Sequence, residues 1–317
     1  MKKLLLFFFV MPIKIFAFSE DGDYHLHLGG SVSREFLQSL AVNDVRDDLI
    51  AQINDPSLSI KLFSISHQLL NSPERIKSAT LDVINKSEAS YLEIRTGLRS
   101  FDESKNYQPY LDSFVQALRE SPKAVKGYLS VDRFKSEHDK NYINFIIDAA
   151  LKNSDVIAGI DISGFSPHAP RMLEGEFLSQ TIEKILQHNL CLTIHMGETQ
   201  SQEEYRDSTT VLSSLQKLFE KNSLYRQKVR LGHVIFLTDE QVGILLELRV
   251  PCEFCPSSFI FLTKNIEFDH KKHPLKKIFK EGVSVLLGTD DTLIFQTSFK
   301  EEQNKFKQFF ILGEPMH

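Results

Sequence analysis

Short runs of apolar and β-branched residues recur along the chain, and each is typical of a buried strand. We expect strands at 24–28, 91–97, 124–131, 157–164, 191–198, 229–234, 250–256 and 283–291. Between them, apolar residues recur with helical periodicity, as in "FLSQTIEKILQHN" and "TDEQVGILLELR". Strands that alternate with helices form parallel βα units. Eight such units favour a closed barrel over an open sheet, so the pattern predicts an α/β protein with a (β/α)8 TIM barrel.

Composition fits one globular domain. The chain has 317 residues, of which 42% are hydrophobic and 25% are charged, enough to bury a full core. No repeat or low-complexity linker interrupts residues 20–317, so we expect a single domain there. The net charge of −5, without a long Lys/Arg run, gives no electrostatic reason to expect a nucleic-acid partner.

The first 19 residues, "MKKLLLFFFVMPIKIFAFS", have the charged start and short apolar run of a signal peptide. They predict a secreted or periplasmic protein with no stable membrane association after the signal is removed. Lys14 interrupts the apolar run and leaves open an uncleaved anchor or a cytoplasmic N-terminus. Three cysteines, Cys191, Cys252 and Cys255, are an odd number and give no disulfide framework.

Residues that could bind a metal or take part in catalysis lie at the C-terminal ends of the expected strands. They are His25, His27, Gly164, His195, Glu198, His233, Asp290 and Asp291. In a (β/α)8 barrel this end carries the active site, because the loops of all eight strands converge there.

Four of these residues form a candidate metal site. His25 and His27 are two residues apart on one strand, so both point to the same face. By themselves they could be hydrogen-bonded barrel histidines. His195 ends another strand and adds a third nitrogen, and Asp290 ends the last strand and adds a carboxylate. Three His and one Asp suit one zinc ion with an open position for water.

The motifs "HLHLGGS", "GIDISG", "HMGE", "LGHV", "CPSS" and "GTDD" occur in the order and approximate spacing of the adenosine deaminase family. The chain resembles this family from Tyr24 to about Lys307. Two segments, "FSISHQLLNSPE" and "YLSVDRFKS", are more similar to the branch that acts on N6-methyl-AMP. The resemblance implies an amidohydrolase-type barrel that hydrolyses the 6-amino group of a small purine substrate, such as adenosine, and releases ammonia.

The resemblance also implies roles for individual residues. One zinc on His25, His27, His195 and Asp290 would supply the hydroxide that attacks C6.

Glu198 matches the proton donor to N1, and His233 matches the residue that orients the hydroxide. Asp291 matches the group that binds N7, and the backbone N–H of Gly164 matches the contact to N3. Glu198 must hold a proton, so we expect a desolvated pocket that raises its pKa. The alternatives are a solvent-exposed Glu198, a packed barrel His233 and a simple tight turn at Gly164.

Two features depart from the family pattern. Adenosine-specific members commonly carry an acidic residue that binds the ribose hydroxyl where Gly29 stands here. A nucleotide, a modified nucleoside or a free base therefore stays open as the substrate. After Asp291 the closing helix at 298–312 is expected, but the helical segment that follows it in the family is shortened, which predicts exposed apolar surface.

Several other functions stay open. They are an N6-methyl-AMP or adenine deaminase, and a truncated, weakly active secreted binding protein. A cytidine-deaminase-type site is disfavoured, because "PCEFC" fits P-C-x-x-C but no H-x-E occurs in the chain. A two-metal amidohydrolase is disfavoured because "IAGIDISG" lacks the lysine that often bridges two ions. Nothing in the sequence indicates the oligomeric state.

Overall fold

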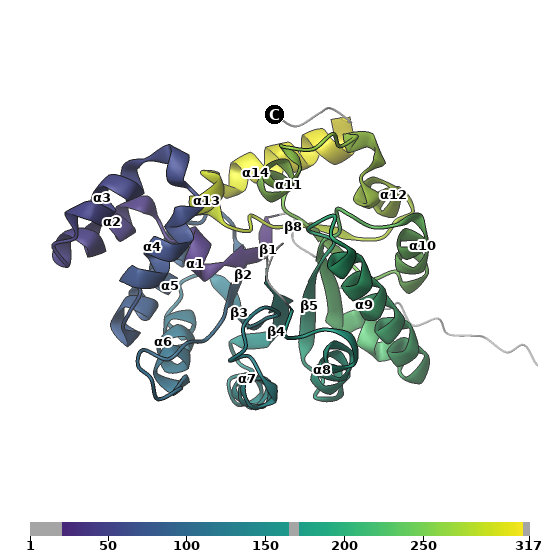
Figure 1. Ribbon diagram of the computed structural model, residues 1–317, viewed down its shortest axis with the longest axis horizontal. Coiled ribbons are helices and arrows are strands. Elements are labelled where there is room, and N and C mark those ends of the chain that lie inside the picture. Colours follow the sequence, from purple (N-terminus) through teal and green to yellow (C-terminus); the bar gives the residue numbers. More distant parts are fainter. Residues whose placement is uncertain (1–20, 165–170, 313–317) are drawn as a thin grey trace, which may run out of the picture.

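The computed structural model describes residues 21–164 and 171–312, and the expected signal peptide at 1–19 lies outside them. Eight strands form one parallel sheet that follows chain order. They are β1 (Gly22–His27), β2 (Tyr91–Thr96), β3 (Ala124–Asp132), β4 (Ile157–Ser163), β5 (Cys191–Met196), β6 (Val229–His233), β7 (Cys252–Phe254) and β8 (Val285–Leu287). The prediction of a (β/α)8 barrel is confirmed (Figure 1).

The sheet closes where β1 meets the segment that follows β8. The backbone N–H of Asp290 donates to the carbonyl of His25 at 2.7 Å, and that of His27 donates to the carbonyl of Asp290 at 2.8 Å. Closure of the barrel therefore places three of the four candidate metal ligands, His25, His27 and Asp290, next to one another.

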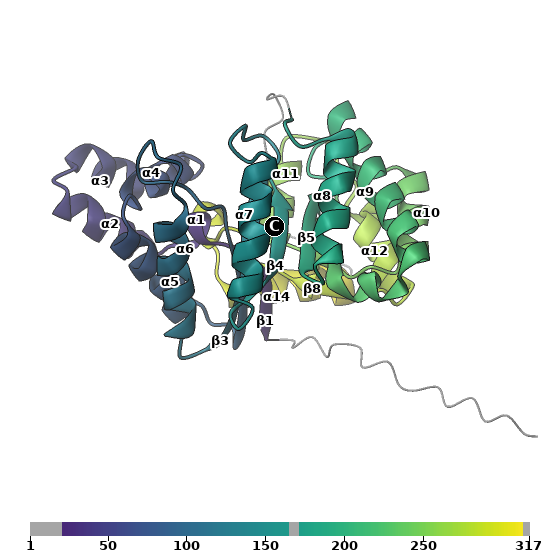
Figure 2. The same cartoon turned by 90° about the horizontal axis from the view of Figure 1, so that it is seen from below.

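Helices surround the strands. They are α1 (Leu28–Ser31), α2 (Arg34–Asn43), α3 (Asp47–Asn54), α4 (Lys61–Leu69), α5 (Pro73–Lys86), α6 (Gln108–Arg119), α7 (Lys140–Lys152), α8 (Gly175–Gln187), α9 (Gln202–Lys221), α10 (Asp239–Leu248), α11 (Pro256–Thr263), α12 (Pro274–Lys280), α13 (Thr292–Phe295) and α14 (Phe299–Lys307). Both views show α2, α3 and α4 as a group at one end of the molecule (Figure 1; Figure 2). No helix within the described ranges is long and apolar enough to cross a bilayer.

Local sequence sets where many helices begin. Ser201 accepts from the backbone of Glu204 at the start of α9, and Thr238 forms a capping box with Gln241 at the start of α10. Such caps satisfy backbone N–H groups that have no partner within the helix. The buried faces of the helices and strands join in one apolar core.

The closing helix expected at 298–312 is present as α14 and the π-helical turn η4 (Gln308–Leu312). Phe309 is buried, and its ring lies 4.8 Å from that of Phe254 in β7. Ile311 and Leu312 are 68% and 62% exposed. The end of η4 therefore carries two exposed apolar side chains.

Candidate metal centre and active site

The structure brings the four predicted ligands to one place at the C-terminal end of the barrel. Nitrogen atoms of His25, His27 and His195 all lie within 4.8 Å of one another. Nε2 of His25 is 3.2 Å from Nε2 of His27. Oδ1 of Asp290 lies 3.4 Å from the first of these nitrogens and 3.5 Å from the second.

The orientation of the His25 ring fits a bound cation. Its Nδ1 lies 2.9 Å from Oε2 of Glu253, so this nitrogen carries the proton in the neutral ring. The lone pair on Nε2 then faces His27 and Asp290. Two imidazole nitrogens and a carboxylate oxygen that face one another are the donor set of a divalent metal such as zinc.

The backbone around the site is strained. His233, Val234 and Asp290 have φ values of 64°, 55° and 60°, in the left-handed region that non-glycine residues rarely adopt. Surrounding structure must hold such residues in place, and they concentrate at functional sites. Asp290 has this conformation while its backbone closes the barrel.

Glu198 and His233 lie next to the candidate ligands and are buried. Oε1 of Glu198 lies 3.2 Å from Nδ1 of His195, and the ring of His233 lies 5.0 Å from that of His195. The exposed-rim alternative for Glu198 is therefore wrong. Burial lowers the pKa of His233 to about 4, so its ring is neutral near pH 7 and can accept a hydrogen bond.

We expected a raised pKa for Glu198, but the surrounding side chains by themselves lower it. Burial acts in the expected direction, but the interactions of this carboxyl with His233, His195 and Arg133 outweigh burial and lower the pKa to about 2. Burial likewise lowers the pKa of His195, but Asp161 and Glu198 outweigh it and raise that pKa to about 10. A histidine that binds a metal is neutral. If His195 binds a metal, it therefore loses the positive charge that lowers the pKa of Glu198.

Asp291 is buried, and its Oδ1 has no hydrogen-bond partner among the described residues. Burial and the neighbouring Asp290 raise its pKa well above the ordinary value. A protonated carboxyl can donate to an acceptor nitrogen such as purine N7. Gly30 makes room for this side chain, because a Cβ there would lie 1.8 Å from Oδ1 of Asp291.

Gly164 follows β4 with φ of +113°, a conformation that favours glycine. A Cβ there would lie 2.4 Å from Oδ1 of Asp132. Its carbonyl accepts a hydrogen bond from Arg133 at 3.3 Å. The tight-turn alternative and a close backbone approach to a ligand both require this glycine.

A buried ion-pair network beneath the site was not anticipated from the sequence. Arg95 lies 2.5 Å from Glu253 and 3.1 Å from Asp161. The same oxygen of Glu253 also contacts His25, and the same oxygen of Asp161 also contacts His195. Arg230 and Glu93 extend the network. The sequence did contain a signal for this network, because its charged residues lie inside apolar strands. Charged side chains are buried in such strands only when they are paired.

Cys255 is also close to two of the candidate metal ligands. Its sulfur lies with His25 and Asp290 in a group whose ligand atoms are within 4.8 Å of one another. All three cysteines are free.

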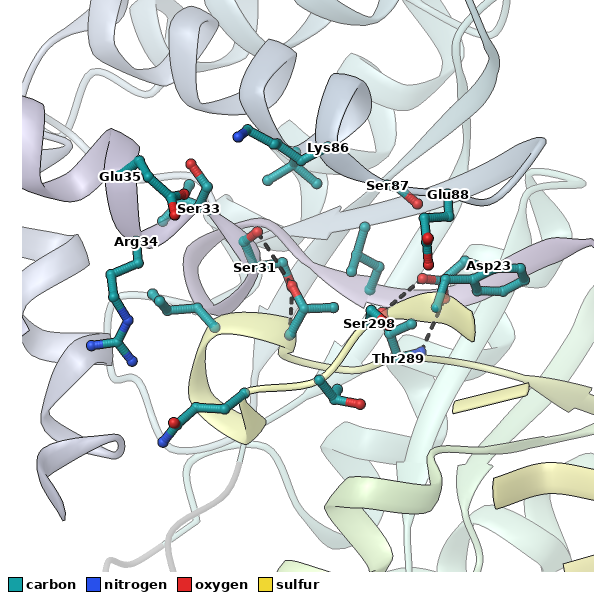
Figure 3. Close-up of a pocket in the computed structure, with 18 residues that line it drawn as sticks. Asp23, Ser31, Ser33, Arg34, Glu35, Lys86, Ser87, Glu88, Thr289 and Ser298 are labelled. Atoms are coloured by element: carbon teal, nitrogen blue, oxygen red, sulfur yellow. Dashed lines mark hydrogen bonds between the residues drawn. The ribbon is translucent and has the colours of Figure 1, made fainter. Parts of the chain in front are cut away.

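A separate groove of about 320 Å³ lies beside the β1–β8 closure. It is lined by Leu26, which alternates with His25 and His27 along β1, and by residues of α2, α5 and α14. Figure 3 shows Asp23 and Thr289 at one side of it, joined by hydrogen bonds. None of the four predicted ligands lines this groove, so it is distinct from the candidate metal centre.

The chain is similar to known deaminases over most of its length. A family model described as adenosine deaminase matches residues 22–315. The N6-methyl-AMP deaminase of Danio rerio is 26% identical over 308 residues, which cover 88% of this chain and 82% of that protein. The adenosine deaminase of Clostridium acetobutylicum is 24% identical over 312 residues, which cover 92% and 87%.

Among solved structures, Arabidopsis ADAL complexed with IMP superimposes with a TM-score of 0.70 and 25% identity, covering 91% of this chain and 85% of that one. Together with the barrel and its buried site, these likenesses establish a hydrolytic deaminase. The chain belongs to the adenosine deaminase family.

Proposed function

We propose that this protein hydrolyses the 6-amino group of an adenine nucleoside or nucleotide, with one zinc ion held by His25, His27, His195 and Asp290. The observation that carries the proposal is the convergence of these side chains beside buried Glu198 and Asp291. The products are the 6-oxo purine, such as inosine, and ammonia.

Zinc in such a site lowers the pKa of a water molecule toward 7 and so makes hydroxide available near neutral pH. Glu198 gives a proton to purine N1, which makes C6 more electrophilic. Neutral His233 accepts a hydrogen bond from the attacking water and orients it toward C6. Asp291 binds N7, and the backbone N–H of Gly164 binds N3. Water adds to C6, and the amino group leaves as ammonia.

Gly29 favours N6-methyl-AMP as a second candidate substrate. A Cβ on Gly29 would have no heavy atom within 4 Å, so the space beside this residue is open, and glycine itself carries no carboxylate. An acidic residue here would repel a 5′-phosphate, and its absence removes that obstacle. The similarity to the N6-methyl-AMP deaminase of Danio rerio points in the same direction.

One enzyme preparation is enough to compare the candidate substrates. Zinc-loaded protein is incubated with adenosine, adenine, AMP and N6-methyl-AMP, and the amine released and the 6-oxo purine are measured. Asp290→Asn, which weakens the metal site, serves as the inactive control. We expect one zinc per chain by mass spectrometry of the metal content. Release of no amine from any of the four would overturn the proposal, and two tightly held ions would favour a two-metal amidohydrolase.

A further inference from the structure

Arg133, the residue after β3, connects two groups that act on the same edge of the purine. Its Nη2 donates to the carbonyl of Gly164 at 3.3 Å and lies 4.0 Å from Oε1 of Glu198. The side chain is 1% exposed. One guanidinium nitrogen therefore lies between the proposed proton donor to N1 and the peptide proposed to bind N3.

The backbone of Arg133 also forms hydrogen bonds to the chain around Gly164. Its N–H donates to the carbonyl of Ser163 at 2.9 Å, and its carbonyl accepts from the N–H of Met172 at 2.7 Å. Ser163 and Met172 lie on either side of Gly164 along the chain. Arg133 thus contacts Gly164, the residue before it and Met172 at the start of the next described segment.

Helix α9 in turn holds the guanidinium. Nη1 of Arg133 lies 3.5 Å from Oδ2 of Asp207 and 3.9 Å from Oε1 of Glu204, and both carboxylates are buried. Oε1 of Glu204 also accepts from the N–H of Gly197, next to Glu198, at 2.8 Å. The ends of β3 and β5 are therefore fixed to one helix.

We propose that Arg133 is a positioning residue, which sets the Glu198 carboxyl and the Gly164 peptide at the spacing of purine N1 and N3. This inference rests on the proposed function, because the two roles come from it. A planar, rigid guanidinium can hold three partners at once, which an ammonium on a flexible stem does not. Displacement of a reacting group by about 1 Å costs on the order of 10²-fold in rate.

Arg171 provides the matched control. It binds the same two carboxylates, with Nη2 2.6 Å from Glu204 and Nε 2.6 Å from Asp207. Its ion pairs do not include Glu198. If Arg133 only balances buried charge, then removing either arginine has the same consequences.

The test compares Arg133→Gln, Arg133→Lys and Arg171→Gln as zinc-loaded full-length protein. We expect R133Q to keep one zinc and to lower kcat about 10²-fold, with KM changed much less. R171Q lowers the melting temperature by a similar amount but lowers kcat less than about 3-fold. R133K restores the melting temperature and leaves kcat at least about 10-fold low. Equal kcat losses in R133Q and R171Q, or full rescue by R133K, would overturn the inference.

Crystal structures separate this inference from the proposed function, since they need no turnover. We expect the 3.2 Å contact between Oε1 of Glu198 and Nδ1 of His195 to be lost in R133Q and kept in R171Q. If R133Q does not fold, R133K supplies the same comparison. An unmoved Glu198 and Gly164 in the Arg133 variant overturns the positioning role, whereas a wild-type protein without activity overturns the proposed function alone.

Discussion

Oε2 of Glu253, on β7, lies 2.9 Å from Nδ1 of His25, on β1. The same oxygen accepts from Arg95 at 2.5 Å, and all three side chains are buried. One carboxylate therefore fixes the tautomer of a candidate metal ligand and neutralises a buried guanidinium. Metal-site chemistry and barrel stability depend on the same residue.

Replacing Glu253 with Gln should weaken both properties. The amide keeps the shape but leaves Arg95 and Arg230 without its charge, and a broken buried ion pair costs about 3–5 kcal/mol. We expect zinc affinity to fall about 10–100-fold, measured by chelator competition. Glu120→Gln, which removes an exposed partner of Lys77, should cost at most about 1 kcal/mol in urea unfolding. Unchanged zinc affinity in E253Q would contradict the assignment.

Glu198→Gln should retain the metal and lose turnover. The amide cannot give its proton to N1, and general acid catalysis is worth about 10²–10⁴-fold in kcat. Steady-state kinetics together with the zinc content check this. Glu203→Gln, on the exposed start of α9, is the control and should leave kcat unchanged. Full activity in E198Q would exclude Glu198 as the proton donor.

Gly30→Ala and Gly29→Ala should differ sharply although the two glycines are adjacent in α1. A Cβ on Gly30 would lie 1.8 Å from Oδ1 and 2.5 Å from Cγ of buried Asp291, so this carboxyl must move. We expect G30A to lose at least about 10²-fold in activity. A Cβ on Gly29 would meet nothing within 4 Å, and G29A should gain up to about 1 kcal/mol in stability with activity unchanged. Similar behaviour of the two variants would be evidence against this packing.

His138 should make the protein less stable in mild acid. Its Nδ1 accepts from the backbone N–H of Asp132 at 2.8 Å, and its ring stacks on Tyr142. Burial, with a contribution from Lys135 that exceeds the opposing one from Asp139, lowers its pKa from 6.5 to about 3. The unfolded chain therefore binds more protons between these values, and stability falls as the pH drops below about 6.5.

The expected slope from this one histidine is about 1.4 kcal/mol per pH unit. His138→Asn keeps a short side-chain acceptor but does not titrate. Urea unfolding at pH 7 and pH 5 should show a correspondingly shallower loss in this variant than in the wild type. Equally steep loss in both proteins would mean that His138 is not held neutral in the fold.

The sequence by itself determined the architecture and the identity of the candidate site residues. Each strand is a short local run of apolar residues that can be recognised without knowing its neighbours, although β7 and β8 are shorter than the pattern predicts. His25 and His27 share a face because strands alternate with a period of two. In a parallel barrel all strand ends lie on one rim, so the strand order predicted that His195 and Asp290 lie near these two histidines. The structure places Asp290 after the end of β8, in an isolated bridge with Leu26 of β1.

Only the tertiary structure decided which charges pair and how they change the site. Arg95 meets Glu253 across 158 positions of the chain, and Arg133 meets Asp207 across 74. No periodicity predicts such pairs, because they depend on which side chains the closed barrel buries together. The effect of the surrounding side chains on the pKa of Glu198 could not be predicted from the sequence for the same reason. Burial and nearby cations act on it in opposite directions, and the distances between atoms decide which effect is larger.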